Sequence, residues 1–104
     1  MRLLASAVGI LVLAACAGEV AWPKTAGDTT CQEWRTSMRP AQRNAMGSAI
    51  LLILRARDGV GRAPEDGLVA SFVGALGDVC ANTPDEKVSA VAATLYVLSD
   101  DLKR

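Results

Sequence analysis

Two cysteines, Cys31 and Cys80, constrain the fold of this chain more than any other feature. A disulfide between them would close a long loop, and by restricting the unfolded chain it would stabilise the folded one by about 4 kcal/mol. A single hydrophobic core of the size available to residues 31–104 rarely supplies more than about 3–5 kcal/mol. We therefore expect the cross-link to contribute a large share of the stability.

The amino terminus has the features of a secretion signal. Arg2 provides a positive charge, and residues 3–13 form an apolar stretch that is too short to span a membrane comfortably. We expect residues 1–15 to be the signal peptide and the rest to be exported. An exported chain meets oxidising conditions, which favour a disulfide between Cys31 and Cys80.

Residues 13–16, with the sequence Leu-Ala-Ala-Cys, resemble the lipobox of bacterial lipoproteins. That resemblance implies cleavage before Cys16 and acylation, with palmitate among the acyl chains, of both the Cys16 thiol and the new amino terminus. Anchoring to the cell membrane by more than one acyl chain is stable. The alternative is an ordinary cleaved signal with a chance cysteine. Lipidation of Cys16 would leave one cysteine pair, which suits an exported protein with three cysteines.

Residues 16–30 are expected to be the lipidated cysteine and a flexible tether. They contain Gly, Pro and Thr and show no apolar periodicity. Within this stretch, Trp22 would either lie in solvent or contact the lipid interface. Residues 31–104 are expected to be the folded domain, outside the cytoplasm.

The domain is expected to be all-α, a small bundle of four helices. Thr30 and Glu33 form a capping box at the first helix, and the second runs from residue 40 or 41 to 58 and ends at Gly59. The third begins at residues 64–66. A second capping box at residues 83–86 predicts the start of the fourth, which buries residues including Leu98, and residues 100–104 are expected to fray. Glycines in the third helix weaken it and permit close helix approach: Gly67, Gly74 and Gly77.

The second helix has an unusually wide apolar arc of roughly 200°. Leu51 falls outside the arc, among polar residues. This width allows two interpretations, a central core helix or a helix with a spare apolar edge for a partner. The expected client- or partner-binding residues are Trp34, Met46, Ile50, Leu51 and Leu54.

Composition argues against several function classes. The formal net charge is zero, so nucleic acid is not an expected partner. Histidine is absent, which removes the commonest general base and metal ligand. Serines without an activating base, and acidic pairs at helix starts, do not form a catalytic set. We therefore expect no enzyme activity, no metal and no cofactor.

The domain resembles the HdeA family of exported acid-stress chaperones, in its actinobacterial and phage lipoprotein branch. The resemblance covers residues 30–100 and rests on Thr30-Cys31-Gln32-Glu33-Trp34 with Met38, Ala41-Gln42-Arg43, Arg57-Asp58-Gly59, Pro64-Glu65-Asp66, Leu68-Val69-Ala70-Ser71-Phe72, Cys80 and Val91-Ala92-Ala93-Thr94-Leu95-Tyr96. It implies a helical bundle with one disulfide, a dimer near neutral pH, and exposure of apolar surface in acid to hold unfolded clients. Classical members are soluble in the periplasm, whereas this chain carries the lipobox.

The leading interpretation is a membrane-anchored, HdeA-like lipoprotein that binds unfolded proteins as an acid-stress holdase, with a homodimer as one expected state. Protonation of all carboxylates would move the side-chain charge after residue 15 from about −1 to about +10, and self-repulsion loosens compact states. The alternative is a phage-encoded superinfection-exclusion or immunity lipoprotein that contacts an envelope or phage protein.

Overall fold

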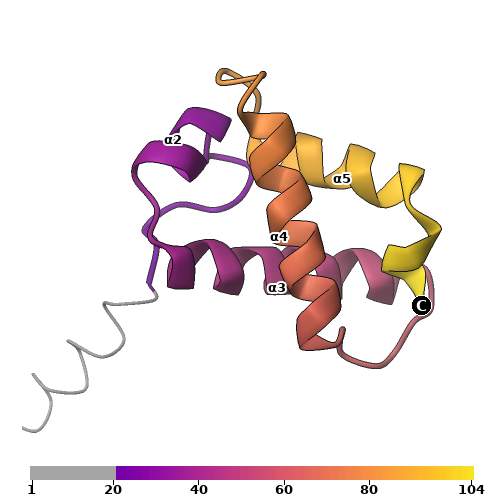
Figure 1. The fold of residues 1–104 in the computed structure, drawn as a ribbon. Helices are drawn as coiled ribbons and strands as arrows, with labels where there is room; N and C mark the ends of the chain where they lie inside the picture. Colours follow the sequence, from indigo (N-terminus) through magenta and orange to yellow (C-terminus); the bar gives the residue numbers. More distant parts are fainter. Residues whose placement is uncertain (1–20) are drawn as a thin grey trace, which may run out of the picture.

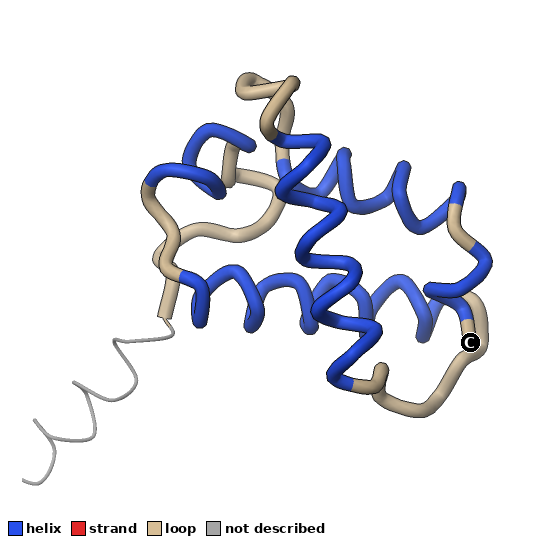
Figure 2. The backbone as a smooth tube through the Cα atoms, viewed as in Figure 1, coloured by secondary structure: helices blue, strands red, loops and turns tan. Residues whose placement is uncertain are grey.

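The computed structural model describes residues 21–104, which form an all-α bundle with no strand in this range (Figures 1 and 2). This confirms the predicted fold class. The expected signal peptide and the expected lipidation site at Cys16 lie outside the described residues. The elements are α2 (Cys31–Thr36), α3 (Pro40–Arg57), α4 (Asp66–Cys80), α5 (Val88–Leu98) and the 3-10 turn η1 (Asp100–Lys103).

Helix α2 begins with the predicted capping box. The Thr30 hydroxyl accepts a hydrogen bond from the Glu33 N–H at 3.1 Å, and the Glu33 carboxylate accepts one from the Thr30 N–H at 3.1 Å. Both backbone donors would otherwise lack partners at a helix start. The prediction from residues 30 and 33 is confirmed.

Helix α3 ends as its glycine predicts. Gly59 has a φ of +81°, in the left-handed region that an L-residue with a side chain rarely adopts. This turn lets the Val60 N–H donate to the Arg55 carbonyl at 2.9 Å, which satisfies an oxygen of the last helical turn. The chain then reverses toward α4.

The predicted disulfide joins Cys31 at the start of α2 to Cys80 at the end of α4, and neither residue is exposed. Six residues are too few for a helix that is stable by itself. Backbone hydrogen bonds also hold α2: the Cys31 N–H donates to the Glu86 carbonyl at 2.8 Å, and the Val88 N–H donates to the Thr29 carbonyl at 2.9 Å. The disulfide and these bonds bring the start of α2, the end of α4 and the start of α5 together.

Helix α4 crosses both α3 and α5 and packs against each of them (Figure 1). Its buried residues, Val69, Phe72, Leu76 and Cys80, recur every three or four residues and so lie on one side of the helix, toward the core. The buried apolar residues of the core are Cys31, Trp34, Met38, Leu51, Val69, Phe72, Leu76, Cys80, Val88, Val91, Ala92, Tyr96 and Leu102. The disulfide and this core all lie within residues 21–104, so we expect this part of the chain to fold alone.

The start of α5 differs from the prediction. Residues 83–86 form a turn and not a capping box, and the helix begins at Val88. The Thr83 hydroxyl donates to the Val79 carbonyl at 3.0 Å instead of capping a new helix. Thr83 therefore belongs to the end of α4, and the predicted second capping box is wrong.

The carboxyl-terminal residues are also better packed than expected. They form η1, and Leu102 is only 6% exposed, whereas Leu98 is 77% exposed. The turn after α5 redirects the chain, so that Leu102 enters the core in place of Leu98. The predicted burial of Leu98 and the predicted fraying of residues 100–104 are wrong.

Close approach of α3 and α4 depends on Gly47, and not on the glycines of α4. A Cβ atom added at Gly47 would lie 2.5 Å from Cγ2 of Val73, a distance that real contacts do not show. At Gly67 and Gly74 an added Cβ would meet nothing within 4 Å. Val73 of α4 therefore occupies the space that a side chain at position 47 would need.

Substituting Gly47 should expose this dependence. We expect Gly47→Ala to lower the free energy of unfolding by about 1–2 kcal/mol, because crowding a packed contact costs about 1–3 kcal/mol and the helix gains at most about 1 kcal/mol from alanine. Val73 is β-branched and stiff, so it yields poorly. Urea unfolding of residues 21–104 measures the change.

The matched control is Gly74→Ala, the same substitution at an open position of α4. It should be neutral or raise the free energy of unfolding by up to about 1 kcal/mol, because only the helix propensity changes. If the two variants change stability equally, the α3–α4 contact at Gly47 is not what limits the packing.

Candidate functional site

Helix α3 presents an apolar face to solvent, on the side opposite the core. Leu52 is 44% exposed and Ile53 is 52% exposed. The other members of this outer face are alanines, and all are exposed. The outer face of α3 consists of Ala45, Ala49, Leu52, Ile53 and Ala56.

The inner face of α3 is formed by Gly47, Leu51 and Arg55, which are spaced four residues apart and are all buried. Leu51 is fully buried, although the sequence placed it on the partner-binding edge. Trp34, the other buried member of the predicted site, is 1% exposed. Neither side chain lies at the surface of this fold, so neither contributes to an exposed face of the folded domain.

The remaining predicted site residues have intermediate positions. Met46, Ile50 and Leu54 are half-buried and pack against the core from the flanks of α3. They line the border between the inner and the outer face. The structure therefore brings these three together along the helix, and it exposes Leu52 and Ile53 while Leu51 and Trp34 are buried.

Two interactions set the rotation of α3. Gly47 lets α4 approach closely, and the guanidinium of Arg55 turns inward, where it donates to the Leu102 carbonyl at 3.0 Å. A helical wheel assigns arginine to solvent and apolar residues to the core. For α3 it therefore predicts that Leu52 and Ile53 are buried and Arg55 is exposed, the opposite of what the structure shows. The sequence alone does not indicate that Gly47, Leu51 and Arg55 form the buried face of this helix.

A groove runs beside the outer face. It has a volume of about 350 Å³, lies between α3 and the segment before α2, and is walled mostly by apolar side chains. We call it the α3 groove. Its lining residues are Trp22, Lys24, Ala26, Gln42, Ala45, Met46, Ala49, Ile50 and Ile53.

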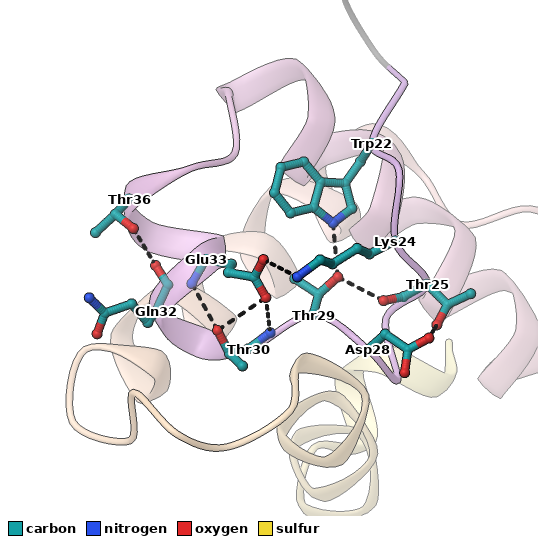
Figure 3. A network of polar contacts seen from close by, with 9 residues as sticks. All are labelled: Trp22, Lys24, Thr25, Asp28, Thr29, Thr30, Gln32, Glu33 and Thr36. Carbon is teal, nitrogen blue, oxygen red and sulfur yellow. Dashed lines mark hydrogen bonds and ion pairs between the residues drawn. The ribbon is translucent and has the colours of Figure 1, made fainter.

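Polar contacts hold the segment that forms the second wall of the groove (Figure 3). The indole N–H of Trp22 donates to the Thr29 hydroxyl at 2.8 Å, and that hydroxyl donates to the Thr25 carbonyl at 2.7 Å. At the end of the segment, Gln42 of α3 donates to the Ala21 carbonyl at 2.8 Å. The first two contacts hold residues 22–29 together, and the third holds Ala21 against α3.

These contacts change the boundary of the expected tether. Thr29 is fully buried, and Trp22 packs against the core cluster. Residues 21–30 therefore belong to the folded domain, and Trp22 is not a solvated linker residue. A tryptophan buries a large area, and its partner Thr29 satisfies the indole N–H.

Glu33 and Lys24 form an ion pair beside the groove, with 2.6 Å between Nζ and Oε2 (Figure 3). The hydrogen bond from Lys24 and then that from the Thr30 N–H lower the pKa of Glu33 below its ordinary value of 4.5. The charged carboxylate therefore both caps α2 and holds Lys24 on the groove wall. Acid weakens both contacts.

Neither a metal site nor a membrane-spanning helix is found in the described part of the chain. Among residues 21–104, no three His, Cys, Asp or Glu side chains gather in a way that could hold a metal ion. No helix in that range has the length and hydropathy needed to cross a membrane. The groove offers apolar contact area and one ion pair at its edge.

Comparisons with known proteins do not assign a family. No family model matches the chain, and no curated protein or solved structure matches it significantly. The resemblance to the HdeA family therefore enters below as part of a proposal.

The stability contributed by Glu33 should depend on pH. A carboxyl group with a lowered pKa in the folded state stabilises that state above its ordinary pKa of 4.5, and the contribution is lost as the pH falls through the lowered value. We expect Glu33→Gln to be less stable than the wild-type chain at neutral pH, and the difference to disappear in strong acid. Urea unfolding over a pH series measures both.

Lys24→Met is the partner variant, because it removes the same ion pair and leaves the capping box in place. Its free energy of unfolding should fall at neutral pH, but by less than that of Glu33→Gln. The difference from the wild-type chain should likewise disappear in strong acid. Equal stability of Glu33→Gln and the wild-type chain at neutral pH would contradict the role given to this pair.

Proposed function

We propose that this chain is a membrane-anchored, HdeA-like lipoprotein that binds other polypeptides and acts as an acid-stress holdase. The binding surface is the outer face of α3 together with the α3 groove. The role is non-enzymatic. Cys16 is the anchor in this proposal, and a disulfide-linked domain is compatible with export.

One observation carries the proposal: helix α3 keeps a continuous apolar face on its solvent side. Leu52 and Ile53 are about half exposed and lie among exposed alanines. Single exposed apolar residues are ordinary, but a contiguous apolar surface marks a binding site in a small protein. The proposed client contacts are therefore Leu52 and Ile53, with Met46 and Ile50 at the groove.

The groove suits side chains of an unfolded polypeptide. Its lining combines the small side chains of Ala45 and Ala49 with the large apolar side chains of Trp22 and Ile53. Apolar side chains of many shapes gain from such a surface because burial of apolar area is not directional. A client that exposes its core in acid offers such side chains.

Low pH is the proposed trigger. Protonation of the carboxylates leaves about +10 of side-chain charge after residue 15, and this charge keeps the protein and a bound client soluble through repulsion. The ion pair of Glu33 with Lys24 is lost in the same range, which loosens the wall of the groove. Histidine is absent, so any switch acts in the range of Asp and Glu.

The test is suppression of aggregation. Residues 21–104 should keep an acid-unfolded test protein in solution at about pH 2–3, where carboxylates are protonated. Ile53→Lys should lose most of this effect, because it places a charge in the outer face of α3. Lysine is preferred to aspartate because aspartate is uncharged at this pH. Light scattering measures aggregation.

Val97→Lys is the matched control, since Val97 is 70% exposed on α5 and does not line the groove. It should suppress aggregation as well as the wild-type chain does. Equal loss in both variants would place binding elsewhere, and no suppression by the wild-type chain at any acid pH would remove the holdase. Leu51→Asp is unsuitable, because it puts a carboxyl group into the core.

A further inference from the structure

The charges of the chain cancel overall, but they are segregated along its length. Residues 21–62, which contain α2 and α3, carry seven Lys or Arg and three Asp or Glu. Residues 63–104, which contain α4 and α5, carry three Lys or Arg and seven Asp or Glu. The outer face of α3 therefore belongs to the basic half of the domain.

The surface around this face is basic at close range as well. Helix α3 contains three arginines and no acidic residue. Arg57 in its last turn is exposed, and so is Arg39 at its N-cap. No acidic residue lines the α3 groove, whereas Lys24 does. The exposed apolar side chains of α3 therefore lie between positive charges at the two ends of the helix.

A larger cavity at the other end of the bundle lacks this charge preference. It has a volume of about 630 Å³ and lies between the start of α4 and the carboxyl-terminal turn. Leu68, Phe72 and Leu95 are among its apolar lining residues. Its charged lining residues have both signs: Arg55, Arg62, Glu65, Asp101 and Arg104.

The chain enters the domain beside the outer face of α3 (Figure 1). Gln42 of α3 donates to the Ala21 carbonyl at 2.8 Å, and the segment that follows Ala21 forms a wall of the α3 groove. Cys16 lies five residues before Ala21, and five residues span at most about 18 Å. A lipid anchor at Cys16 therefore keeps this side of the domain close to the membrane.

We propose that the outer face of α3 docks on the anionic lipid surface that holds the anchor. Leu52 and Ile53 lie at the headgroup boundary, where the apolar face of an amphipathic helix is buried. Arg39 and Arg57 are attracted to the anionic headgroups. The contact can be weak by itself, because the anchor holds the two surfaces at a high effective concentration.

This inference rests on the proposed function for the anchor at Cys16, and it adds regulation of the same surface. While the outer face of α3 lies on lipid, it is closed to polypeptide clients. A client must therefore displace the membrane before it can occupy Leu52 and Ile53.

The test uses residues 16–104, with the Cys16 thiol coupled to a maleimide lipid in nanodiscs. The coupling is selective because the other two cysteines form the disulfide. A gadolinium chelate on some headgroups broadens the NMR signals of methyl groups near the membrane. The measurement is made at neutral pH, in discs with phosphatidylserine and in discs of phosphatidylcholine alone.

We expect stronger broadening at Leu52 and Ile53 than at Val97 and Leu98, which are 70% and 77% exposed on α5. Exposure alone would favour the two residues of α5, so a preference for α3 reports docking. The preference should be large with phosphatidylserine and small without it, because the attraction of arginine depends on anionic lipid.

A matched pair of variants tests the charge. Arg57→Gln should lower the ratio of docked to free domain about fivefold, the effect of one basic side chain near an anionic surface. Lys87→Gln removes the same charge at an exposed position before α5, and it should leave the ratio unchanged.

Equal broadening on α3 and α5, the same preference in both kinds of disc, or equal effects of the two variants overturns the proposal. A second copy on the outer face would make the Leu52 and Ile53 signals of residues 21–104 shift with protein concentration in the absence of lipid, and that result also overturns it. The nanodiscs contain no client and the aggregation assay contains no lipid. Failure of docking is therefore distinguishable from failure of the holdase.

Discussion

The junction of Cys31 with Cys80 supports the rest of the structure. A six-residue helix cannot persist by itself, and the disulfide fixes α2 to the end of α4 while backbone hydrogen bonds join its first residues to the start of α5. Trp34 can then fill the core beneath this junction, and residues 21–29 are led back across α3. One covalent bond between distant positions thus organises three helices and the wall of the groove.

The rotation of α3 decides which surfaces the molecule offers. Because Gly47 faces α4 and Arg55 faces the carboxyl-terminal turn, the helix turns Leu52, Ile53 and three alanines toward solvent. The same inward arginine lines the cavity at the other end of the bundle. The apolar outer face therefore originates in the packing of one helix.

The α3 groove and the cavity at the other end of the bundle differ in chemistry and position. The α3 groove is shallow and apolar with one acid-sensitive ion pair at its edge, which suits varied apolar side chains of an unfolded chain. The second cavity is larger, and its lining combines apolar side chains with both basic and acidic ones.

The sequence by itself determined the helical class, the disulfide, the first capping box and the glycine end of α3, because each depends on local residue chemistry or on the count of cysteines. It identified α3 as the helix with surplus apolar surface, but chose Leu51 and Trp34, which are buried, and passed over Leu52 and Ile53. Only the tertiary structure decided the rotation of α3, the place of Trp22 and the burial of Leu102. Those depend on a close contact at Gly47 and on carbonyls that reach Arg55 from the far end of the chain, and no local pattern encodes such long-range contacts.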